Sequence, residues 1–209
     1  MMLSENIGKF IVIEGLDGSG KSTQAKMLAE RIEKSGKPCL ATRQPSDGQV
    51  GQMARAATKS GFPLDNEAVA LLFAADRVQH FHDEIAPALA AGKYVVCDRY
   101  YYSNLAYQGV DEAAFRRVTA YNQWIMTHGR PDIVIFLDVP PEACMERIQR
   151  RHEEISIYES LALLQAQRER FLYAFSQSKG GENILTVNAD GKDVDTVSDL
   201  VWDKLLARQ

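Results

Sequence analysis

The segment of the sequence with the clearest chemistry reads Gly15-Leu16-Asp17-Gly18-Ser19-Gly20-Lys21-Ser22, which is G-x-x-x-x-G-K-S in full. An apolar run precedes it and a helical pattern follows, which is the context that this phosphate-binding motif requires. Gly15 and Gly20 permit a turn whose backbone N–H groups line a concavity for phosphate oxygens, and the helix start adds its positive end. Lys21 is expected to reach the β and γ phosphates, and the Ser22 hydroxyl to ligate Mg²⁺.

The motif predicts a nucleoside triphosphate site, and GTPases, motor ATPases and small-molecule kinases all share it. The chain has no N-K-x-D segment of the kind that reads guanine, which disfavours a GTPase. Its 209 residues leave little chain for the machinery of a motor ATPase. These features favour a compact kinase, which needs a second phosphate pocket facing the first.

Arginines near the ends of expected strands could build that second pocket. Arg43 follows one such strand, Asp98-Arg99 follows another, and Arg77 lies on a long helical stretch. Ligands of an open parallel sheet bind beyond the carboxyl ends of its strands, and a guanidinium binds phosphate oxygens in bidentate geometry. A single arginine is more often part of a surface ion pair. Three arginines converging on one edge indicate a phosphate acceptor.

Strand and helix patterns alternate along the chain. Apolar, β-rich runs predict strands at 9–14, 38–42, 93–97, 132–138 and 183–187. Helical spacing predicts helices at 21–35, 65–91 (with Pro87 as the expected break), 111–128, 141–151, 159–178 and 193–208. Because the strand runs are apolar on both faces, we expect a three-layer α/β fold, a five-stranded parallel sheet with helices on both faces.

The composition excludes several other classes of protein. Apolar residues make up 45% and charged residues 25%, which is typical of a globular protein, and we expect a single domain over 1–209. The net charge of −4 gives no indication of a nucleic-acid partner, and no apolar run is long enough to span a membrane. Cys39, Cys97 and Cys144 are too scattered for a disulfide framework or a zinc site. With no leader sequence recognisable, we expect a cytoplasmic location.

The order of several motifs is more specific than the phosphate loop alone. They are FIVIEGLDGSGKSTQ at 10–24, TRQP at 42–45, LLFAADR at 71–77, VVCDRYYYSNLAYQG at 95–109, PDIVIFLDVPPE at 131–142 and the region around Arg147 to Glu159. In this order, and over most of the chain, they resemble the thymidylate kinase family of P-loop nucleoside monophosphate kinases. The resemblance implies the strand order 2-3-1-4-5 and the reaction ATP + dTMP → ADP + dTDP with Mg²⁺, in dTTP biosynthesis. It also implies a homodimer, with the apolar face of 65–80 as the candidate surface.

The resemblance also implies roles for matched positions. Arg43 and Arg99 would grip the dTMP phosphate, Phe73 would stack on thymine, and Arg77 would hydrogen-bond the base edge. Tyr102 or Tyr107 would pack beside the deoxyribose and crowd a 2′-hydroxyl. Asp17 would hold the 3′-hydroxyl or help to arrange the metal site. The dTMP-binding set it implies is Asp17, Arg43, Phe73, Arg77, Arg99, Tyr102, Ser103, Asn104, Tyr107 and Gln108.

Asp98 has three interpretations: a contact to hydrated Mg²⁺, a base toward the acceptor phosphate, or a simple structural contact with Arg99. The expected metal residues are Ser22 and Asp98, and the expected catalytic residues are Asp17, Lys21, Arg99 and Arg151. The expected ATP-binding residues are Gly15, Gly18, Ser19, Gly20, Lys21, Ser22, Thr23 and Arg147.

The chain departs from the family pattern in three places. Gln44 and Ser46-Asp47 stand in a loop that usually reads T-R-E-P-G-G, so a carboxylate is missing at position 44. Ser156-Ile157 replace the usual Asp-Arg of the lid, which is expected at 147–159. Gly18 stands where some relatives carry a phosphate-contacting Arg. The resemblance then implies that the lid supplies the phosphate-contacting arginine. Arg151 is the candidate for contacting the transferring group, with Arg150 as the alternative. Arg147, also in the lid, is the candidate for stacking on adenine.

Other functions remain open on the sequence alone. A kinase for another nucleoside monophosphate or for a deoxynucleoside would share the phosphate loop, although a deoxynucleoside kinase would not need several arginines around an acceptor phosphate. A non-catalytic P-loop protein that binds nucleotide without turnover is the alternative from a different class. ADP release that depends on dTMP would distinguish an enzyme from a binding protein.

Overall fold

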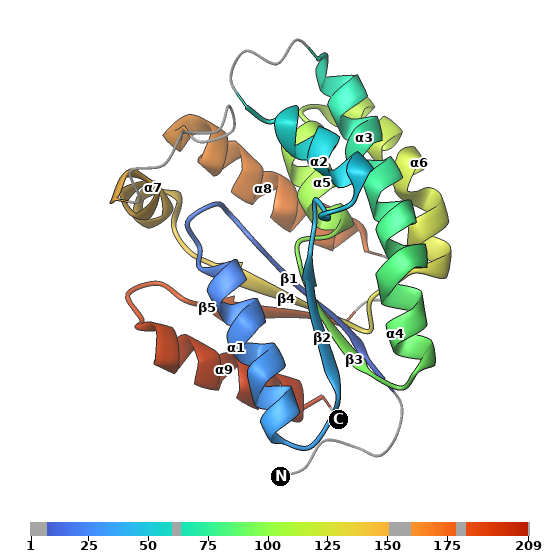
Figure 1. Cartoon of the computed structure of the whole chain (residues 1–209). Coiled ribbons are helices and arrows are strands. Elements are labelled where there is room, and N and C mark those ends of the chain that lie inside the picture. Colours follow the sequence, from blue (N-terminus) through green and yellow to red (C-terminus); the bar gives the residue numbers. More distant parts are fainter. Residues whose placement is uncertain (1–7, 60–63, 151–159, 179–182, 209) are drawn as a thin grey trace.

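The computed structural model describes residues 8–59, 64–150, 160–178 and 183–208. Five strands form one sheet, in which every neighbouring pair is parallel and the order is β2-β3-β1-β4-β5. This is the order that the family resemblance implied (Figure 1). The strands are β1 (Phe10–Gly15), β2 (Cys39–Arg43), β3 (Tyr94–Asp98), β4 (Ile133–Asp138) and β5 (Asn183–Asn188).

The three central strands form the middle of the hydrophobic core. All residues of β1 and β3 are buried, as are all of β4 except Asp138. A strand buried on both faces needs apolar side chains at successive positions rather than at alternate ones. The runs FIVIEG, YVVCD and IVIFLD supply them, with the exception of Glu14 and two aspartates at the strand ends.

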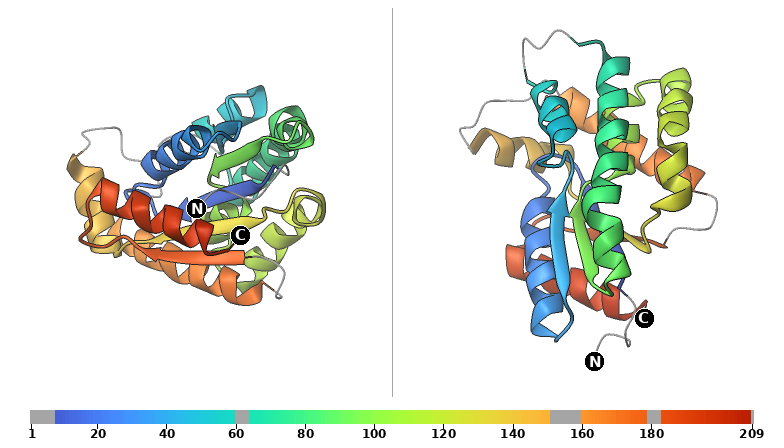
Figure 2. Two further views of the ribbon diagram at one scale, coloured as in Figure 1. Left: turned by 90° about the horizontal axis from the view of Figure 1, so that it is seen from below. Right: turned by 45° about the vertical axis from the view of Figure 1, so that its right-hand side comes forward.

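Helices cover both faces of the sheet. One face carries α1 and α9, which pack against each other, and the other carries α3, α5, α6 and α8 (Figure 2). The described helices are α1 (Lys21–Lys34), α2 (Gln49–Ala56), α3 (Asn66–His80), the π-helical turn η1 (Phe81–Ile85), α4 (Ala86–Ala90), α5 (Tyr101–Gln108), α6 (Glu112–His128), α7 (Pro141–Arg150), α8 (Leu161–Gln177) and α9 (Val194–Leu206). The expected three-layer α/β fold is confirmed.

Two predictions about helices need correction. The stretch from α3 to α4 continues past Pro87, and the irregularity is instead the π-helical turn η1 before it. Proline lacks an N–H and its ring crowds the preceding turn of carbonyls, which a wider turn accommodates. The helices α2 and α5 were not predicted at all. The sequence of α5, YYSNLAYQ, is rich in residues of weak helix propensity. The sequence of α2, QVGQMARA, consists mostly of good helix formers but is short and has a glycine in its interior.

Candidate active site

The phosphate-binding loop joins β1 to α1 in the predicted position. Its backbone is left-handed at Gly18 (φ 80°) and at Gly20 (φ 91°), the residue that caps the start of α1. A Cβ on Gly18 would come within 2.5 Å of the Cys144 carbonyl oxygen in α7. Both positions therefore need glycine, Gly20 for its backbone angle and Gly18 also for the close approach of α7. The loop ends at the N-terminus of a 14-residue helix, where an anion is favoured.

Lys21 is folded over this loop and buried. Its Nζ donates to the Leu16 carbonyl oxygen at 3.0 Å and to Asp17 Oδ1 at 3.4 Å. Burial and the nearby Arg99 charge lower the pKa of Lys21, while Asp17 opposes that shift. The Lys21 ammonium is thus held beside the loop, within reach of a phosphate bound there.

Asp17 links the loop to the end of β3 and to α5. Its Oδ1 accepts from Arg99 Nη2, and its Oδ2 accepts from the Tyr107 hydroxyl at 2.8 Å. Burial alone would raise the pKa of Asp17, but the charges of Arg99 and Lys21 outweigh it and hold that pKa well below its usual value. Asp17 is therefore a fixed anion between two cations.

The Ser22 hydroxyl and the Asp98 carboxylate meet beside the loop. Ser22 Oγ donates to Asp98 Oδ2, whereas Asp98 Oδ1 is buried with no hydrogen-bond partner among the described residues. An orphaned carboxylate oxygen next to a P-loop hydroxyl fits a hydrated Mg²⁺ shared with the phosphates of a nucleotide. Within the described part of the chain, no group of three or more His, Cys, Asp or Glu side chains could hold a metal by itself.

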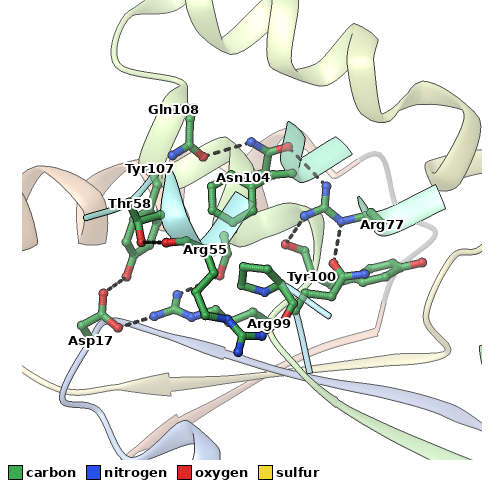
Figure 3. Close-up of a pocket in the computed structure, with 13 residues that line it drawn as sticks. Asp17, Arg55, Thr58, Arg77, Arg99, Tyr100, Asn104, Tyr107 and Gln108 are labelled. Atoms are coloured by element: carbon green, nitrogen blue, oxygen red, sulfur yellow. Dashed lines mark hydrogen bonds and ion pairs between the residues drawn. The ribbon is translucent and has the colours of Figure 1, made fainter. Parts of the chain in front are cut away.

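A pocket of about 200 Å³ opens next to the phosphate loop, and Asp17 and Arg99 lie between the two (Figure 3). Eight residues predicted for the acceptor site line it: Asp17, Phe73, Arg77, Arg99, Ser103, Asn104, Tyr107 and Gln108. Five further lining residues were not among those predicted for the acceptor site: Gln44, Pro45, Arg55, Thr58 and Tyr100. The pocket is bounded by α3 and α5, which contact each other, and by the segment that runs from β2 into α2.

Arg77 is fully buried in the wall of this pocket. Its Nε donates to Gln44 Oε1 at 2.9 Å and its Nη2 to the Tyr100 carbonyl at 3.1 Å. Its Nη1 donates to the side-chain oxygens of Asn104, at 3.2 Å, and Asn122. Burial lowers the pKa of Arg77. The guanidinium is locked in one orientation by four neutral acceptors.

A buried carboxylate fixes the element that carries most of the pocket. Glu14 accepts from the backbone N–H of Tyr100 at 2.8 Å, and from both the backbone N–H (3.1 Å) and the hydroxyl (2.6 Å) of Ser103. Burial raises the pKa of Glu14 despite these donors. Glu14 thereby holds the first turn of α5 against β1. Arg99 reaches that turn from a left-handed backbone conformation (φ 70°), a strained state that tertiary contacts must maintain.

Two of the predicted acceptor residues lie elsewhere. Arg43 ends the edge strand β2 with its side chain 56% exposed, pairs with Asp47 and does not line the pocket. It faces the hollow that also contains Ser22 and Asp98. Tyr102 is buried in the core, 4.8 Å from the Phe175 ring, so Tyr107 is the tyrosine at the pocket. Arg55 on α2 lines the pocket instead, and no motif in the sequence pointed to it.

Arg147 of the expected lid lies beside the phosphate loop. Its Nη1 donates to the Gly18 carbonyl at 3.3 Å, and it lines a hollow with Thr23 and the segment 189–194 after β5. Arg150 is exposed and pairs with Glu146. Arg151, Ser156 and Ile157 lie outside the described residues.

The comparisons with known proteins agree with this geometry. The family model of thymidylate kinases matches residues 13–201. The chain belongs to the thymidylate kinase family. It is 40% identical to a probable thymidylate kinase of Thermococcus gammatolerans over 174 residues, which cover 79% of this chain and 82% of that protein. A probable thymidylate kinase of Methanococcus aeolicus is 33% identical over 205 residues, or 97% and 98% of the two chains.

A solved structure supports the same assignment. The thymidylate kinase from Candida albicans superposes with a TM-score of 0.80 and is 26% identical, covering 98% of this chain and 94% of its own. The expected family and fold are therefore confirmed over nearly the whole length of the chain.

Proposed function

We propose that this chain transfers the γ-phosphoryl group of ATP to dTMP, giving ADP and dTDP. One observation carries the proposal: Asp17 and Arg99 line both the acceptor pocket and the hollow formed by the phosphate loop. The donor and acceptor sites thus share a wall, and phosphoryl transfer depends mainly on such alignment and on positive charge at the transferring group. Family membership supports the same reaction.

On the donor side, the loop from Gly15 to Thr23 would hold the ATP phosphates. Its backbone N–H groups and the start of α1 favour negative charge, and Lys21 would move from the Leu16 carbonyl to the phosphate oxygens. Ser22 and Asp98 would hold Mg²⁺, which when bound neutralises charge on the β and γ phosphates. The orphaned Oδ1 of Asp98 supports that position.

On the acceptor side, the pocket offers a place for each part of dTMP. Arg99 and Arg55 would bind the phosphate, Phe73 would stack on thymine, and Arg77 would donate to a carbonyl oxygen of the base. Tyr107, with its hydroxyl on Asp17, would close the sugar side of the pocket. The roles of Ser103, Asn104 and Gln108 in the base pocket follow from their place in the same wall.

The nucleoside end of ATP and the lid complete the proposal. The hollow between Arg147, Thr23 and the segment 189–194 would take the adenosine, with Arg147 against the adenine ring. Arg151 remains our candidate for the arginine that contacts the transferring phosphate. We further propose one kinase domain, a cytoplasmic location and a homodimer, for which the half-exposed Leu71 on α3 and Trp124 on α6 offer apolar surface. Within the described residues, no helix has the length and apolar character to cross a bilayer.

The test is ADP release measured with ATP-Mg²⁺ and a panel of nucleoside monophosphates and deoxynucleosides. We expect release that depends on dTMP and is slow with each of the others. ADP release that prefers another nucleotide or a deoxynucleoside would support a different acceptor, and nucleotide binding without any acceptor-dependent release would support a binding protein.

A further inference from the structure

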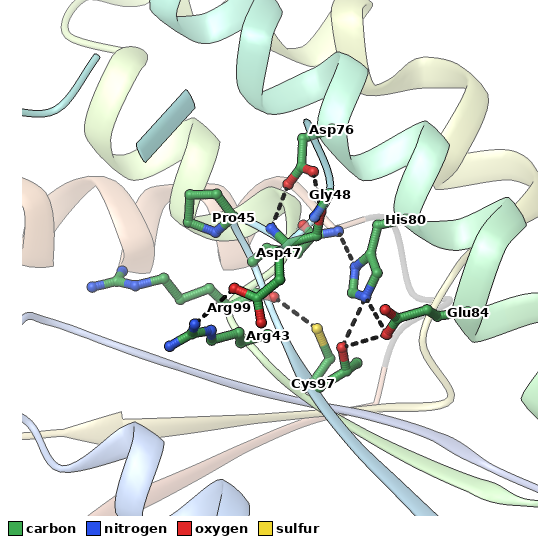
Figure 4. Close-up of polar contacts among 12 residues, drawn as sticks. Arg43, Pro45, Asp47, Gly48, Asp76, His80, Glu84, Cys97 and Arg99 are labelled. Carbon is green, nitrogen blue, oxygen red and sulfur yellow. Dashed lines mark hydrogen bonds and ion pairs between the residues drawn. The ribbon is translucent and has the colours of Figure 1, made fainter. Parts of the chain in front are cut away.

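Gln44 and His80 connect the buried Arg77 to the surface of the molecule. Gln44 sits in the wall of the acceptor pocket after β2, and His80 ends α3, one helical turn beyond Arg77; both side chains are buried. The chain of contacts ends at Glu84 in η1 (Figure 4). We propose that Gln44 and His80 are a matched pair of positioning residues that hold Arg77 as an unpaired cation toward the base of the acceptor. The inference rests on the proposed function of the pocket.

The direction of every hydrogen bond in this chain follows from Arg77. A guanidinium only donates, so the Gln44 atom that faces Arg77 Nε at 2.9 Å must be the carbonyl oxygen. The Gln44 amide nitrogen then faces His80 Nδ1 at 3.2 Å and donates to it. His80 Nδ1 must therefore lack a proton, and a neutral imidazole of that kind carries its proton on Nε2.

The rest of the chain fits that tautomer. His80 Nε2 lies 2.8 Å from Thr42 Oγ1 and 3.2 Å from Glu84 Oε2, and the Thr42 hydroxyl donates to the same Glu84 oxygen at 3.0 Å. The charged groups that face His80 are Glu84, from η1, and Arg77, which is reached through Gln44; the contact from β2 is the uncharged Thr42. Each donor meets an acceptor from the buried guanidinium to the surface carboxylate.

A neutral residue at position 44 has a consequence for the charge of Arg77. Among the described residues, no carboxylate hydrogen-bonds its guanidinium, whose partners are two asparagines, one glutamine and one backbone carbonyl. The charges of Glu14 and Asp76 act on it without a hydrogen bond, so the second N–H of Nη2 remains available to a ligand in the pocket. Thymine presents a carbonyl oxygen at the position where cytosine presents an amino group. A donor-only cation fixed beside that position favours the first base and rejects the second.

A carboxylate at position 44, the residue usual in this loop of the family, would conflict with both features. It would pair the charge of Arg77, and it would place an acceptor oxygen against His80 Nδ1, which would then have to carry a proton. Gln44→Glu replaces the amide NH₂ with a carboxylate oxygen and keeps the shape of the side chain. It therefore tests the charge and the donor at position 44 without opening a cavity. His80→Leu removes the acceptor of the Gln44 amide and leaves that amide free to turn.

The experiment compares Gln44→Glu, His80→Leu and the double variant with the wild type, and His82→Leu serves as the control. His82 is exposed on η1, its ring is tilted against that of Trp124, and it takes no part in the contacts that link Arg77 to Glu84. Steady-state rates with dTMP and with dCMP give KM and kcat for each base. Histidine side-chain ¹⁵N spectra at mildly alkaline pH report which ring nitrogen of His80 carries the proton.

We expect Gln44→Glu and His80→Leu each to raise the dTMP KM by roughly tenfold, as for the loss of one buried hydrogen bond, with kcat and the ATP KM little changed. The preference for dTMP over dCMP should fall in both variants. The rise in the dTMP KM of the double variant should be smaller than the product of the two single rises. The wild-type spectrum should show His80 protonated on Nε2 alone, and Gln44→Glu should add or move a proton to Nδ1.

Three outcomes would contradict the inference. The first is a wild-type His80 that is protonated on Nδ1. The second is an unchanged dTMP KM and base preference in both Gln44→Glu and His80→Leu. The third is a rise in the dTMP KM for His82→Leu as large as that for the two variants. A wild type that does not phosphorylate dTMP would overturn the proposed function and this inference together. An active wild type with unaltered variants would overturn the inference alone.

Discussion

Replacing Arg55 and Arg43 separately with alanine distinguishes the acceptor site of the structure from the one expected from the sequence. Arg55 lines the pocket, and its Nη2 contacts the Pro45 carbonyl at 2.8 Å, the Ser46 carbonyl at 3.1 Å and Asp47 Oδ1 at 3.2 Å. Among the described residues, its Nε and Nη1 have no hydrogen-bond partner, so they are available to a phosphate. Arg43 lies outside the pocket, with its side chain 56% exposed and paired with Asp47.

The expected size of each effect follows from these environments. A hydrogen bond to a charged group contributes about 1.5–3 kcal/mol, and the 39% exposure of the Arg55 side chain places its bond to phosphate near the lower end. Arg55→Ala should therefore raise the dTMP KM by about tenfold, since about 1.4 kcal/mol is one factor of ten. Arg43→Ala should change it by no more than about threefold, because exposed ion pairs contribute little.

The assay is initial-rate ADP release with dTMP varied at saturating ATP-Mg²⁺, and then with ATP varied at saturating dTMP. The ATP KM should stay near the wild-type value in both variants, and thermal unfolding should confirm that both remain folded. A larger rise in the dTMP KM for Arg43→Ala than for Arg55→Ala would refute the reasoning and restore the expectation drawn from the sequence.

Three further predictions concern the pocket and its support. Phe73→Ala should raise the dTMP KM far more than the ATP KM, by the loss of about 1–3 kcal/mol of base stacking; unchanged acceptor affinity in a destabilised variant would assign Phe73 to the core instead. Tyr107→Ala should narrow the rate difference between dTMP and its ribose analogue, whereas Tyr102→Ala, a change in the core, should lower the thermal unfolding temperature without narrowing it. Burial raises the pKa of Glu14, so the folded chain holds a proton that the unfolded chain has already released, and the stability from this group falls as pH rises above 4.5. The thermal unfolding temperature of Glu14→Gln should therefore fall less than that of the wild type between that pH and neutrality. Unfolding temperatures that change in parallel with pH in the two proteins would contradict the raised pKa.

The sheet and the phosphate loop could be predicted because local sequence determines them. Apolar runs buried on both faces define the strands, and the G-x-x-x-x-G-K-S spacing defines the turn between β1 and α1. Phe73 and Arg77 were both implied for the base site, and their spacing of four residues puts them on one face of α3, where both line the pocket. Arg99 was expected at the end of a strand, where ligands of such sheets bind.

The parts that could not be predicted depend on tertiary contacts. The helix α5 forms although it contains several tyrosines, and Glu14, far away in the sequence, holds its first turn. Without the helix, nothing decided which tyrosine faces the pocket. On a helix, Tyr102 and Tyr107 are five residues apart and point in different directions, whereas Ser103 and Tyr107 share a face.

The two arginines illustrate the same limit. Arg43 and Arg55 are both close in sequence to the end of β2, and only the path of the chain through α2 decides which of them enters the pocket. The direction of a side chain on an edge strand is likewise set by its neighbours rather than by its own segment. Arg151, Ser156 and Ile157 lie outside the described residues, so the role expected for Arg151 stays a prediction.

The most direct test of the account follows the γ-phosphate itself. ATP radiolabelled in the γ-phosphate is mixed with dTMP, Mg²⁺ and the protein, and the products are separated. We expect the label in dTDP, and Lys21→Ala should lower the rate of its appearance by at least about 10²-fold, as for the loss of one electrostatic stabiliser. Label that appears only in inorganic phosphate or in another nucleotide, or a Lys21→Ala variant as fast as the wild type, would contradict the account.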